Sequence, residues 1–337
     1  MKKEQKAWKI LVVGYGSMGK RRIRILRKLV KNVQIACMDS SPERRCEAQS
    51  AGLDCYADLE QALAARPDAA FVCTPPGGHA QLILRLLDAG ADIFTELNLV
   101  DDRYDEMIKK AGETGSRIFM SSTMLYNSQI RRIQEAVKTT QKPLTYVYHV
   151  GQYLPDWHPW ENYKDFFASR TETNGVKEIL AIQLPWMFDT FGDVEMVHAV
   201  SQSCTDLDIS FPDSVAVSFV HKTGTIGVFV ADVVSRSPVV SLEVIGEDLH
   251  LFWNGRHDGI RVYRIQTAQM ERLQADMEPE HQKGYSELIA EEPYQAETRD
   301  FLDMLERGSR PRYSLEQDKY TLSVINRIEE LTERGGL

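Results

Sequence analysis

An apolar run that breaks into a glycine-rich turn restricts the fold of this chain more than any other feature. Residues 9–13 read KILVV, residues 14–19 read GYGSMG, and a helix-like segment from Lys20 to Lys31 follows at once. In G-x-G-x-x-G the first glycine permits a tight turn, the second lets a pyrophosphate approach the backbone, and the third lets the helix pack closely on the strand. The N–H groups at the start of such a helix bind phosphate. The sequence therefore predicts a dinucleotide site, with a structural glycine turn as the alternative. The predicted contacts in the turn are Gly14, Tyr15, Gly16, Ser17, Met18 and Gly19.

An acidic residue stands where ribose binding would require one. The apolar run of residues 33–38 ends in Asp39, twenty residues after Gly19, and an acid at this distance accepts the two ribose hydroxyls of an adenosine. A carboxylate repels a 2′-phosphate, so we expect NAD as the cofactor. NADP stays open as the alternative, because neighbouring side chains could accommodate a phosphate. These neighbours are Ser40, Ser41, Arg44 and Arg45.

The bulk composition excludes several classes of protein. A chain of 337 residues with 43% hydrophobic content can fill two cores. A net charge of −9 argues against a general binder of nucleic acid or anionic membranes. The basic cluster Lys20-Arg21-Arg22 is expected to lie mostly on a solvated helix face, close enough to the helix start to help with phosphate.

The cysteines and the N-terminus indicate the compartment. The five cysteines form no C-x-x-C pair, which favours reduced thiols over a disulfide framework or a zinc site. Residues 1–6 are polar and no apolar run approaches membrane-spanning length. We therefore expect a cytoplasmic protein that works without nucleic acid or membrane.

Residues 9–121 alternate between short apolar runs and helical segments, a pattern that specifies a doubly wound parallel sheet. Ligands bind beyond the carboxyl ends of such strands. We expect the glycine turn, Asp39, the run Thr74–His79 and the run Glu96–Asn98 to lie along one rim. His79 has two interpretations: a contact to cofactor or substrate, or a helix-start side chain packed under the Pro-Pro loop. The further predicted cofactor contacts are Ser40, Thr74, Pro75, His79 and Glu96.

The chain resembles the Gfo/Idh/MocA oxidoreductases over nearly its whole length. The resemblance rests on Gly14–Gly19, on Thr74-Pro75-Pro76-x-x-His79, on the strand end Thr95–Leu99 and on the layout of the second half. It implies an α/β fold with an NAD(P)-binding Rossmann domain over residues 1–124. It further implies a substrate-binding and oligomerisation α/β domain over residues 125–337, with an open, mostly antiparallel sheet. The exposed face of that sheet pairs subunits in the family, which implies a homodimer or homotetramer.

Three positions depart from the family pattern. The family's Glu-Lys-Pro stands here as Glu96-Leu97-Asn98, its Asp-x-Gly-x-His helix matches Ile179–Gln183, and its arginine matches Leu125. Oxidation of a carbinol needs a base for the hydroxyl proton, and neither leucine nor a neutral amide supplies one. The family's lysine, aspartate and histidine therefore do not carry over to these positions.

One segment of the second half is rich in side chains that recognise sugars. Residues 151–167 read GQYLPDWHPWENYKDFF, and aromatic faces stack on sugar rings while polar groups bind hydroxyls and carboxylates. The loop resembles a branch of the same family that also lacks the lysine and is linked to cell-surface or nonulosonic-acid sugars, which implies a sugar-derived substrate. The alternative is a structural loop whose tryptophans pack on the following helix. The predicted substrate contacts are Tyr153, Asp156, Trp157, Trp160, Glu178 and Trp186.

Four residues are candidates for catalytic roles. His158 is the first choice because an imidazole titrates near neutrality. Tyr163 and Lys164 form a reserve pair, since a lysine lowers the pKa of a nearby phenol. In the helix of residues 175–187, Gln183 stands at the position of the family histidine and is preferred to Glu178 as a hydroxyl ligand. No metal is expected, because the acids and the histidine of residues 189–198 lack the spacing of a metal site and are better explained by a polar turn at Gly192.

The rest of the second half predicts strands and two closing helices. Residues 214–221 and 225–234 indicate a hairpin, residues 239–245 and 250–253 continue the sheet, and residues 266–284 indicate a polar loop. Residues 293–306 and 315–334 indicate helices. We predict an NAD(P)-dependent oxidoreductase that acts on a sugar, sugar acid or nucleotide sugar, either as a dehydrogenase or in a redox-neutral reaction. The alternative is a catalytically degenerate relative that binds a sugar or a partner.

Overall fold

The structure of the protein is a computed structural model, and it describes residues 7–158, 162–265, 267–273, 280–281 and 290–334. The chain divides into two compact units, the first made of Met1–Ser121 and Tyr294–Lys319, and the second of Ser122–Pro293 and Tyr320–Leu337. Each unit carries one sheet. The assignment of NAD(P) binding to residues 1–124, and of substrate binding and association to residues 125–337, is kept as a proposal.

The first unit is built on a six-stranded sheet in the order β3-β2-β1-β4-β5-β6. Every neighbouring pair in this sheet is parallel, which confirms the predicted doubly wound Rossmann architecture. The short strand β3 was not predicted. The strands are β1 (Trp8–Val13), β2 (Val33–Met38), β3 (Asp54–Tyr56), β4 (Ala69–Val72), β5 (Asp92–Thr95) and β6 (Ile118–Met120).

Local sequence explains where the helices of the first unit begin. Ser41 Oγ accepts a hydrogen bond from Arg44 N at 3.2 Å and caps the second helix, with Pro42 at the first helical position. Asp58 Oδ1 caps the third helix by accepting a bond from Gln61 N at 2.9 Å. The helices are α1 (Ser17–Leu29), α2 (Pro42–Ser50), α3 (Leu59–Ala64), η1 (Pro76–Gly78), α4 (His79–Asp88), α5 (Tyr104–Thr114) and α8 (Glu292–Arg307).

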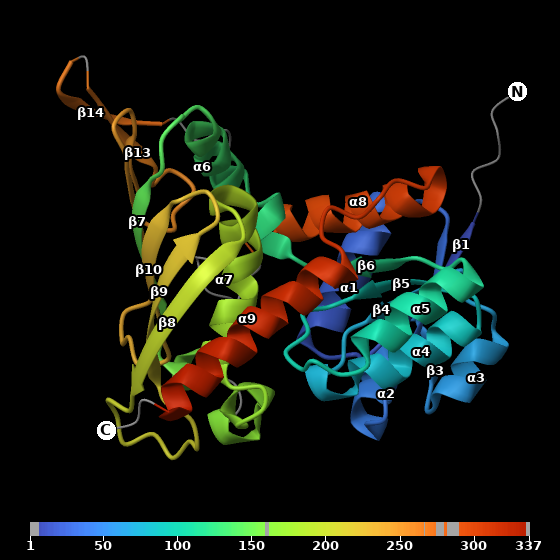
Figure 1. The fold of residues 1–337 in the computed structure, drawn as a ribbon. Coiled ribbons are helices and arrows are strands. Elements are labelled where there is room, and N and C mark those ends of the chain that lie inside the picture. The colour runs from blue at the N-terminus through green and yellow to red at the C-terminus, as the bar shows by residue number, and fades with distance from the viewer. Residues whose placement is uncertain (1–6, 159–161, 266, 274–279, 282–289, 335–337) are drawn as a thin grey trace, which may run out of the picture. The chain divides into compact units, whose positions relative to one another are not determined.

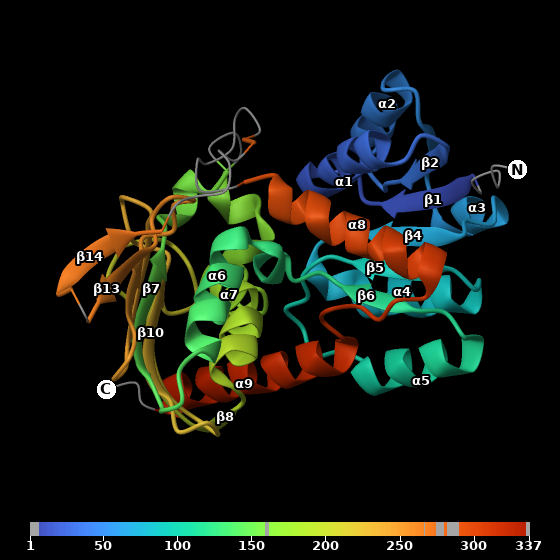
Figure 2. The ribbon, with the colours of Figure 1, turned by 90° about the horizontal axis from the view of Figure 1, so that it is seen from above.

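Helix α8 returns from the far end of the sequence to cover the sheet of the first unit. It runs beside α1 on one face of that sheet, and α4 and α5 lie on the other face (Figure 2). The ring of Phe301, which is fully buried, meets the rings of Phe71, Phe94 and Phe119 edge-on at 5.0, 5.5 and 5.8 Å. Edge-to-face packing of this kind stabilises a core beyond the area that it buries. The predicted helix over residues 293–306 is therefore confirmed.

The second unit carries an eight-stranded sheet in the order β14-β13-β12-β11-β7-β10-β9-β8. Only β7 and β10 run parallel, and the other pairs are antiparallel, so the predicted open, mostly antiparallel sheet is confirmed among the described residues. The strands are β7 (Thr145–Gly151), β8 (Val194–Gln202), β9 (Ser214–His221), β10 (Ile226–Asp232), β11 (Val239–Ile245), β12 (His250–Trp253), β13 (Arg261–Arg264) and β14 (Gln269–Arg272).

Two predictions for this sheet were wrong. Strand β8 includes Glu195 and His198, which had been attributed to a polar turn at Gly192. Their exposed side chains broke the apolar pattern, although the backbone pairs with β9 along most of its length. Strand β14 lies inside the stretch of residues 266–284 that was predicted as a loop, because all four of its residues are exposed. Residues 266, 274–279 and 282–284 of that stretch lie outside the described residues.

The helices of the second unit lie on one face of its sheet (Figure 1). Helix α6 was not predicted, although Asn127 gives a clear start signal: its Oδ1 accepts bonds from Gln129 N and Ile130 N. Helix α7 is buried along nearly its whole length, as expected for a helix enclosed by a core. The elements are η2 (Thr123–Tyr126), α6 (Ser128–Lys138), η3 (Leu154–Asp156), η4 (Tyr163–Asp165), η5 (Phe167–Ser169), α7 (Gly175–Phe191) and the part of α9 (Leu315–Arg334) that begins at Tyr320.

Under α7, a buried tyrosine lies across a glycine and meets a buried histidine. A Cβ on Gly227 would lie 2.0 Å from Tyr146 Cζ, so only glycine fits beneath that ring. The hydroxyl of Tyr146 lies 3.0 Å from His221 Nε2, and His221 Nδ1 lies 2.6 Å from the carbonyl oxygen of Gly192. These contacts suit a neutral imidazole that donates from Nδ1 and accepts at Nε2.

The free energy of unfolding is expected to decrease at low pH, because the folded protein holds His221 in its neutral form. Burial lowers the pKa of this histidine from its ordinary value, so the unfolded chain binds the proton more tightly than the folded one. The free energy of unfolding contributed by His221 is present above the unfolded pKa of about 6.5 and decreases as the pH falls below it, by about 1 kcal/mol per pH unit. Urea unfolding at several pH values measures this slope. The account is contradicted if His221→Asn, which removes the titration, retains the full slope.

No described helix covers the other face of the sheet in the second unit (Figure 1). Large apolar side chains are exposed on this face. Val147 and Val228 are cross-strand partners on this face. We call it the outer face. Its exposed large apolar residues, 39–65% accessible, are Val147, Met196, Val200, Ile226, Val228 and Ile245. In the described part of the chain, no helix is both long and apolar enough to cross a membrane.

Candidate functional site

Each glycine of the turn between β1 and α1 meets a different steric demand. Gly14 has a φ of +99°, in the left-handed region, and a Cβ there would lie 2.8 Å from the carbonyl oxygen of Cys73. A Cβ on Gly19 would lie 1.9 Å from the carbonyl oxygen of Gly14, so only glycine lets α1 pack this closely on β1. A Cβ on Gly16 would meet only Arg44 Nη1, at 3.9 Å. The backbone at Gly16 is therefore open, as the approach of a pyrophosphate requires.

The start of α1 offers N–H groups to an anion. Its N-cap residue, Gly16, has no side chain to cap them, and no acidic residue stands in the first turn. Strand β4 pairs with β1, and just beyond its end the hydroxyl Oγ1 of Thr74 is buried without a hydrogen-bond partner among the described residues. Uncapped N–H groups and an orphaned hydroxyl fit the phosphates and a ribose of the predicted dinucleotide.

The predicted ribose ligand is held in a fixed position. Asp39 Oδ2 accepts a hydrogen bond from Tyr15 N at 2.7 Å, and Oδ1 accepts one from Ser41 N at 2.9 Å. The carboxylate is thereby tied both to the glycine turn and to the start of α2. A group fixed in this way needs little reorganisation to bind a ligand.

Two arginines of α2 lie near this acid, and they differ in how firmly their guanidinium groups are held. Arg45 Nη1 donates to the backbone oxygens of Asp39 at 2.9 Å and Ser40 at 2.8 Å, so its guanidinium holds the loop. Arg44 is half exposed and its Nη1 lies 3.8 Å from Asp39 Oδ2. Arg44 can turn toward a ligand, and it is the stronger candidate for a 2′-phosphate.

His79, at the start of α4, is enclosed by its neighbours. Its Nε2 lies 2.7 Å from the carbonyl oxygen of Thr74, and its Nδ1 lies 3.5 Å from Thr95 Oγ1. Burial lowers the pKa of the ring below its ordinary value, so it is neutral near pH 7. This placement agrees with the packed alternative, and a contact between His79 and a ligand remains a prediction. Pro75, at the same strand end, is exposed.

The strand end that replaces Glu-Lys-Pro is tied into the first unit. Asn98 Nδ2 donates to the hydroxyl of Tyr104 at 2.8 Å and to the carbonyl oxygen of Val100 at 3.0 Å. The same hydroxyl donates to Asp318, whose pKa burial raises to about 7. Asn98 is therefore occupied by its structural contacts.

Glu96 belongs to a buried ion cluster that the sequence gave no sign of. Arg22 Nε donates to Glu96 Oε1 at 2.6 Å, and its Nη2 donates to Glu297 Oε2 at 2.7 Å. Arg22 is 0% exposed, so the expectation of a solvated arginine here was wrong. Burial alone would lower the pKa of Arg22, but Glu96 and Glu297 raise it. We call these three residues the Arg22 cluster. Because Glu96 is paired within it, its role as a cofactor contact remains a prediction.

The aromatic loop of the second unit uses several of its rings for packing. Trp157 Nε1 donates to the carbonyl oxygen of Gln152 at 3.0 Å, and a Cβ on Gly175 would lie 3.3 Å from the Trp157 ring. This tryptophan therefore packs at the start of α7, as the structural alternative expects. Tyr153 carries the guanidinium of Arg236 over its face at 3.6 Å. Trp160 lies outside the described residues.

The candidates for proton transfer in this loop lie in different settings. The ring of His158 packs at 4.1 Å on the ring of Phe166. Lys164 Nζ pairs with Asp208 Oδ2 at 2.6 Å, and Asp208 raises the pKa of this exposed lysine. Tyr163 raises the pKa of Lys164 in the same direction, as a smaller effect, and the joint role of the two residues remains a prediction. Asp156 is exposed.

On α7, Gln183 and Trp186 belong to the core. The Gln183 carbonyl oxygen Oε1 accepts hydrogen bonds from Tyr148 Oη and Trp186 Nε1, both at 2.8 Å. Trp186 is 0% exposed. This oxygen, the best hydroxyl acceptor of an amide, is thus already satisfied by two donors. A role of Gln183 in catalysis, or of Trp186 in substrate binding, remains a prediction.

Glu178, one turn earlier on α7, contrasts with Gln183. Its Oε2 atom is buried and has no hydrogen-bond partner in the part of the chain that the structure describes. Burial raises the pKa of the carboxyl to about 8. A buried polar atom left unpaired in this way is costly and usually marks a functional role or a bound group.

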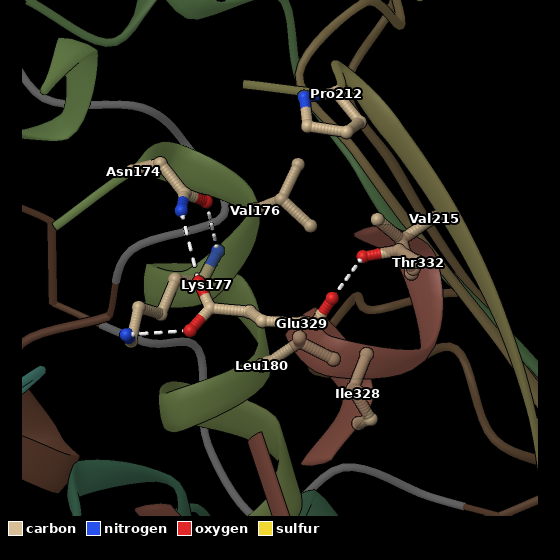
Figure 3. Close-up of a pocket in the computed structure, with 9 residues that line it drawn as sticks. All are labelled: Asn174, Val176, Lys177, Leu180, Pro212, Val215, Ile328, Glu329 and Thr332. Carbon is tan, nitrogen blue, oxygen red and sulfur yellow. Dashed lines mark hydrogen bonds and ion pairs between the residues drawn. The ribbon is translucent and has the colours of Figure 1, made fainter. Parts of the chain in front are cut away.

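A small cavity at the start of α7 is not a substrate site. Asn174, Lys177 and Glu329 form its polar wall, with Lys177 Nζ at 2.7 Å from Glu329 Oε2 and Asn174 Nδ2 at 3.2 Å from Glu329 Oε1 (Figure 3). The cavity measures about 40 Å³, far less than the roughly 300 Å³ or more of small-molecule pockets. Its charged groups already satisfy one another. The cavity is too small for a sugar.

In the described residues, no three side chains of the His, Cys, Asp and Glu types gather as metal ligands do. The candidate cofactor residues lie in the first unit, and the candidate substrate and proton-transfer residues lie in the second.

The parallel sheet, the three-glycine turn and the anchored acid define the first unit as a dinucleotide-binding Rossmann domain. Residues 8–122 match the sequence model of the GFO_IDH_MocA family, described as an oxidoreductase family with an NAD-binding Rossmann fold. The first unit therefore carries the NAD-binding domain of the Gfo/Idh/MocA oxidoreductases. The predicted family and the predicted cofactor class are confirmed at this level.

Solved structures share the fold over nearly the whole chain. An oxidoreductase from Agrobacterium radiobacter in complex with NAD+, L-tartaric acid and magnesium matches with a TM-score of 0.83, 14% identity and 98% coverage of both chains. The WlbA dehydrogenase from Bordetella pertussis, in complex with NADH and UDP-GlcNAcA, matches with a TM-score of 0.80, 17% identity and 98% coverage of both. A UDP-N-acetylglucosamine 3-dehydrogenase from Acidithiobacillus ferrooxidans matches with a TM-score of 0.78, 15% identity and coverage of 98% and 99%. At these identities the likeness shows the fold. No curated protein matches the chain by sequence.

Proposed function

We propose that this protein is an NAD(P)-dependent oxidoreductase that acts at a carbinol carbon of a sugar, a sugar acid or a nucleotide sugar. The observation that carries the proposal is the glycine turn, where Gly14 and Gly19 are forced by close contacts and Gly16 is open. Within this turn, packing does not explain why position 16 is a glycine. The close approach of a pyrophosphate to the backbone does explain it. The net reaction is a dehydrogenation or a redox-neutral change through a transient ketone.

The choice between NAD and NADP is expected to depend on Asp39 and Arg44. The anchored carboxylate of Asp39 favours an unphosphorylated ribose, and the half-exposed guanidinium of Arg44 offers a partner to a 2′-phosphate. Asp39→Ala should weaken NADH binding about tenfold and NADPH binding less, whereas Arg44→Ala should weaken NADPH binding more than NADH binding. Calorimetric titration of the two variants measures these ratios. Equal losses for both cofactors in both variants would contradict the assignment.

The substrate class is proposed from the aromatic loop and from the solved relatives of the fold. Tyr153, Asp156, Trp157 and Trp160 supply rings and polar groups of the kinds that bind sugars. Two of the similar structures are of a UDP-N-acetylglucosamine dehydrogenase and of a dehydrogenase in complex with UDP-GlcNAcA. We extend that substrate class to this chain as part of the proposal.

For proton transfer, we propose Glu178 as a candidate in addition to His158. Oxidation of a carbinol releases the hydroxyl proton to a base, and the bound dinucleotide would accept the hydride. A carboxyl whose pKa is raised to about 8 by burial exchanges protons near neutral pH, as general acid–base catalysis requires. Its Oε2 has no hydrogen-bond partner among the described residues, so it keeps its capacity to accept a hydrogen bond from a substrate hydroxyl. Gln183 is less suited, because its carbonyl oxygen already has two donors.

Turnover assays with NAD+ and NADP+ against sugar acids and nucleotide sugars test this function. Once a substrate is known, Glu178→Gln should lower kcat by about 100-fold or more and change KM little. The amide keeps the shape of the carboxyl group but cannot take up or release a proton near neutral pH. Glu135→Gln serves as the matched control, since it makes the same chemical change at an exposed position of α6, and it should retain most activity. A Glu178→Gln variant with normal kcat and pH profile would overturn the role of Glu178, and an inert wild type with bound cofactor would overturn the oxidoreductase.

The second candidate is a sugar-binding protein that has lost catalysis. It is favoured by Leu97 at the family's lysine position and by the saturated oxygen of Gln183. This candidate predicts binding of a sugar or nucleotide sugar by calorimetry, with no hydride transfer to either cofactor.

We also propose that the outer face of the second unit pairs two copies of the chain. Six large apolar side chains on one sheet face favour face-to-face packing of two sheets, and a second copy supplies the same face by two-fold symmetry. Val228→Asp, at the middle of the sheet, should shift the protein to monomers in sedimentation analysis. Wild type that is monomeric at micromolar concentration would contradict this pairing.

A further inference from the structure

Two cysteines face each other across neighbouring strands beside the anchored acid. Cys37 in β2 and Cys55 in β3 are direct partners in the parallel register, and their Sγ atoms lie 2.7 Å apart. Neighbouring strands lie about 4.7–4.9 Å apart, and a disulfide joins residues whose Cα atoms are about 4.4–6.8 Å apart. The backbone therefore already meets the geometric requirement for a bond between these sulfur atoms.

The two thiols differ in their access to solvent. Cys37 is completely buried, whereas Cys55 is partly exposed. Burial raises the pKa of Cys37, and the contact with Cys55 and the nearby Asp39 carboxylate raise it further. The thiolate is the form that reacts with oxidants, so Cys37 is not the first of the two to be oxidised. A dissolved oxidant reaches Cys55 first.

The pair is connected to the predicted ribose site through short backbone contacts. Asp39 lies two residues after Cys37, and its N–H donates to the carbonyl oxygen of Tyr56, the neighbour of Cys55, at 3.2 Å. The carboxylate of Asp39 is in turn fixed by the N–H groups of Tyr15 and Ser41. A displacement of Cys55 against β2 is therefore transmitted to Asp39 through one hydrogen bond.

We propose that Cys37 and Cys55 form a reversible oxidation site that weakens dinucleotide binding at Asp39. The effect on binding rests on the proposed function, and the formation of the bond does not. A hydroperoxide is the oxidant. Hydrogen peroxide converts the Cys55 thiol to a sulfenic acid and releases one water molecule. The Cys37 sulfur then attacks the Cys55 sulfur, and the hydroxyl group leaves with the Cys37 proton as a second water molecule.

The electrons of this reaction balance. The two thiols lose two electrons in forming the sulfur–sulfur bond, and the peroxide gains them in forming water. A dithiol reductant reverses the step by exchange. Bond formation brings the sulfur atoms from 2.7 Å to about 2.05 Å and fixes both side-chain rotamers. The resulting shift of Tyr56 displaces Asp39 from the geometry that its two N–H donors define.

The test uses the full-length chain. After brief treatment with hydrogen peroxide, blocking of free thiols and digestion, mass spectrometry should find a peptide pair that links Cys37 to Cys55 and is two hydrogen atoms lighter. Cys55→Ser should abolish it. The matched control, Cys46→Ser with Cys204→Ser, removes the two exposed cysteines and should retain it. NADH affinity should fall about tenfold on oxidation, return with dithiothreitol, and stay constant in Cys55→Ser.

Each outcome decides one part of the proposal. Absence of the cross-link, or its formation by Cys46 or Cys204 instead, overturns the oxidation site. A cross-linked protein with unchanged NADH affinity overturns the connection to Asp39. A reduced protein that binds no dinucleotide contradicts the proposed function, whereas the mass of the cross-linked peptide still decides whether the thiol site exists.

Discussion

Gly19→Ala is expected to weaken NADH binding by at least about 100-fold and to destabilise the first unit. A Cβ at this position would lie 1.9 Å from the carbonyl oxygen of Gly14, which is backbone and cannot rotate away. Helix α1 must therefore shift from β1, and its first N–H groups move away from the phosphates that they would hold. A 100-fold loss corresponds to about 2.7 kcal/mol, since each 1.4 kcal/mol is a factor of ten. Calorimetry for binding and urea unfolding for stability measure the two effects.

Two alanine variants make this result specific. Gly16→Ala places its Cβ in open space, with only Arg44 Nη1 at 3.9 Å, so it should keep the stability of the wild type and still lose NADH binding. Gly112→Ala in α5 has no atom within 4 Å of the new Cβ and should keep both. A stable Gly16→Ala variant with normal NADH affinity would show that the turn serves packing alone.

Arg22→Met is expected to lower the free energy of unfolding by about 3–5 kcal/mol. The substitution keeps most of the side-chain volume but leaves the carboxylates of Glu96 and Glu297 buried without their cation, and breaking a buried pair from one side costs about this much. Because Glu297 lies on α8, the loss should also loosen the attachment of that helix to α1. Denaturant unfolding of the wild type and the variant measures the difference.

Two further variants separate charge from packing. Arg24→Met changes an exposed arginine of the same helix and should cost no more than about 0.5 kcal/mol. The double variant with Glu297→Gln removes one of the stranded charges and should recover part of the loss. If Arg22→Met costs no more than Arg24→Met, the Arg22 cluster does not stabilise the fold.

The features that the sequence predicted well are those encoded within a few residues of each other. The glycine turn, the acid twenty residues later and the alternation of strands and helices specify a Rossmann sheet without long-range information. The hairpin of β9 and β10 was predicted for the same reason. Helix α6 was missed although its Asn127 cap was visible in the sequence, so that omission could have been avoided.

The features that escaped prediction depend on partners far apart in the chain. Arg22 meets Glu297 at a separation of 275 residues, and nothing in a basic helix start reveals that one arginine turns inward. Gln183 was matched to a catalytic position through the resemblance to the family's Asp-x-Gly-x-His motif. Its carbonyl oxygen is instead saturated by Tyr148, 35 residues away, and by Trp186. Glu178 was ranked second because Gln183 stands at the position of the family histidine. The burial of Glu178 and its unpaired oxygen become visible only in three dimensions.

The most direct test of the account is titration of the purified full-length protein with NADH and with NADPH, after any retained nucleotide has been removed and identified. The account predicts micromolar binding, tighter for NADH than for NADPH, and loss of that binding in Gly16→Ala. A folded protein that carries no nucleotide and binds neither cofactor would contradict the central claim that the first unit works as a dinucleotide-binding domain.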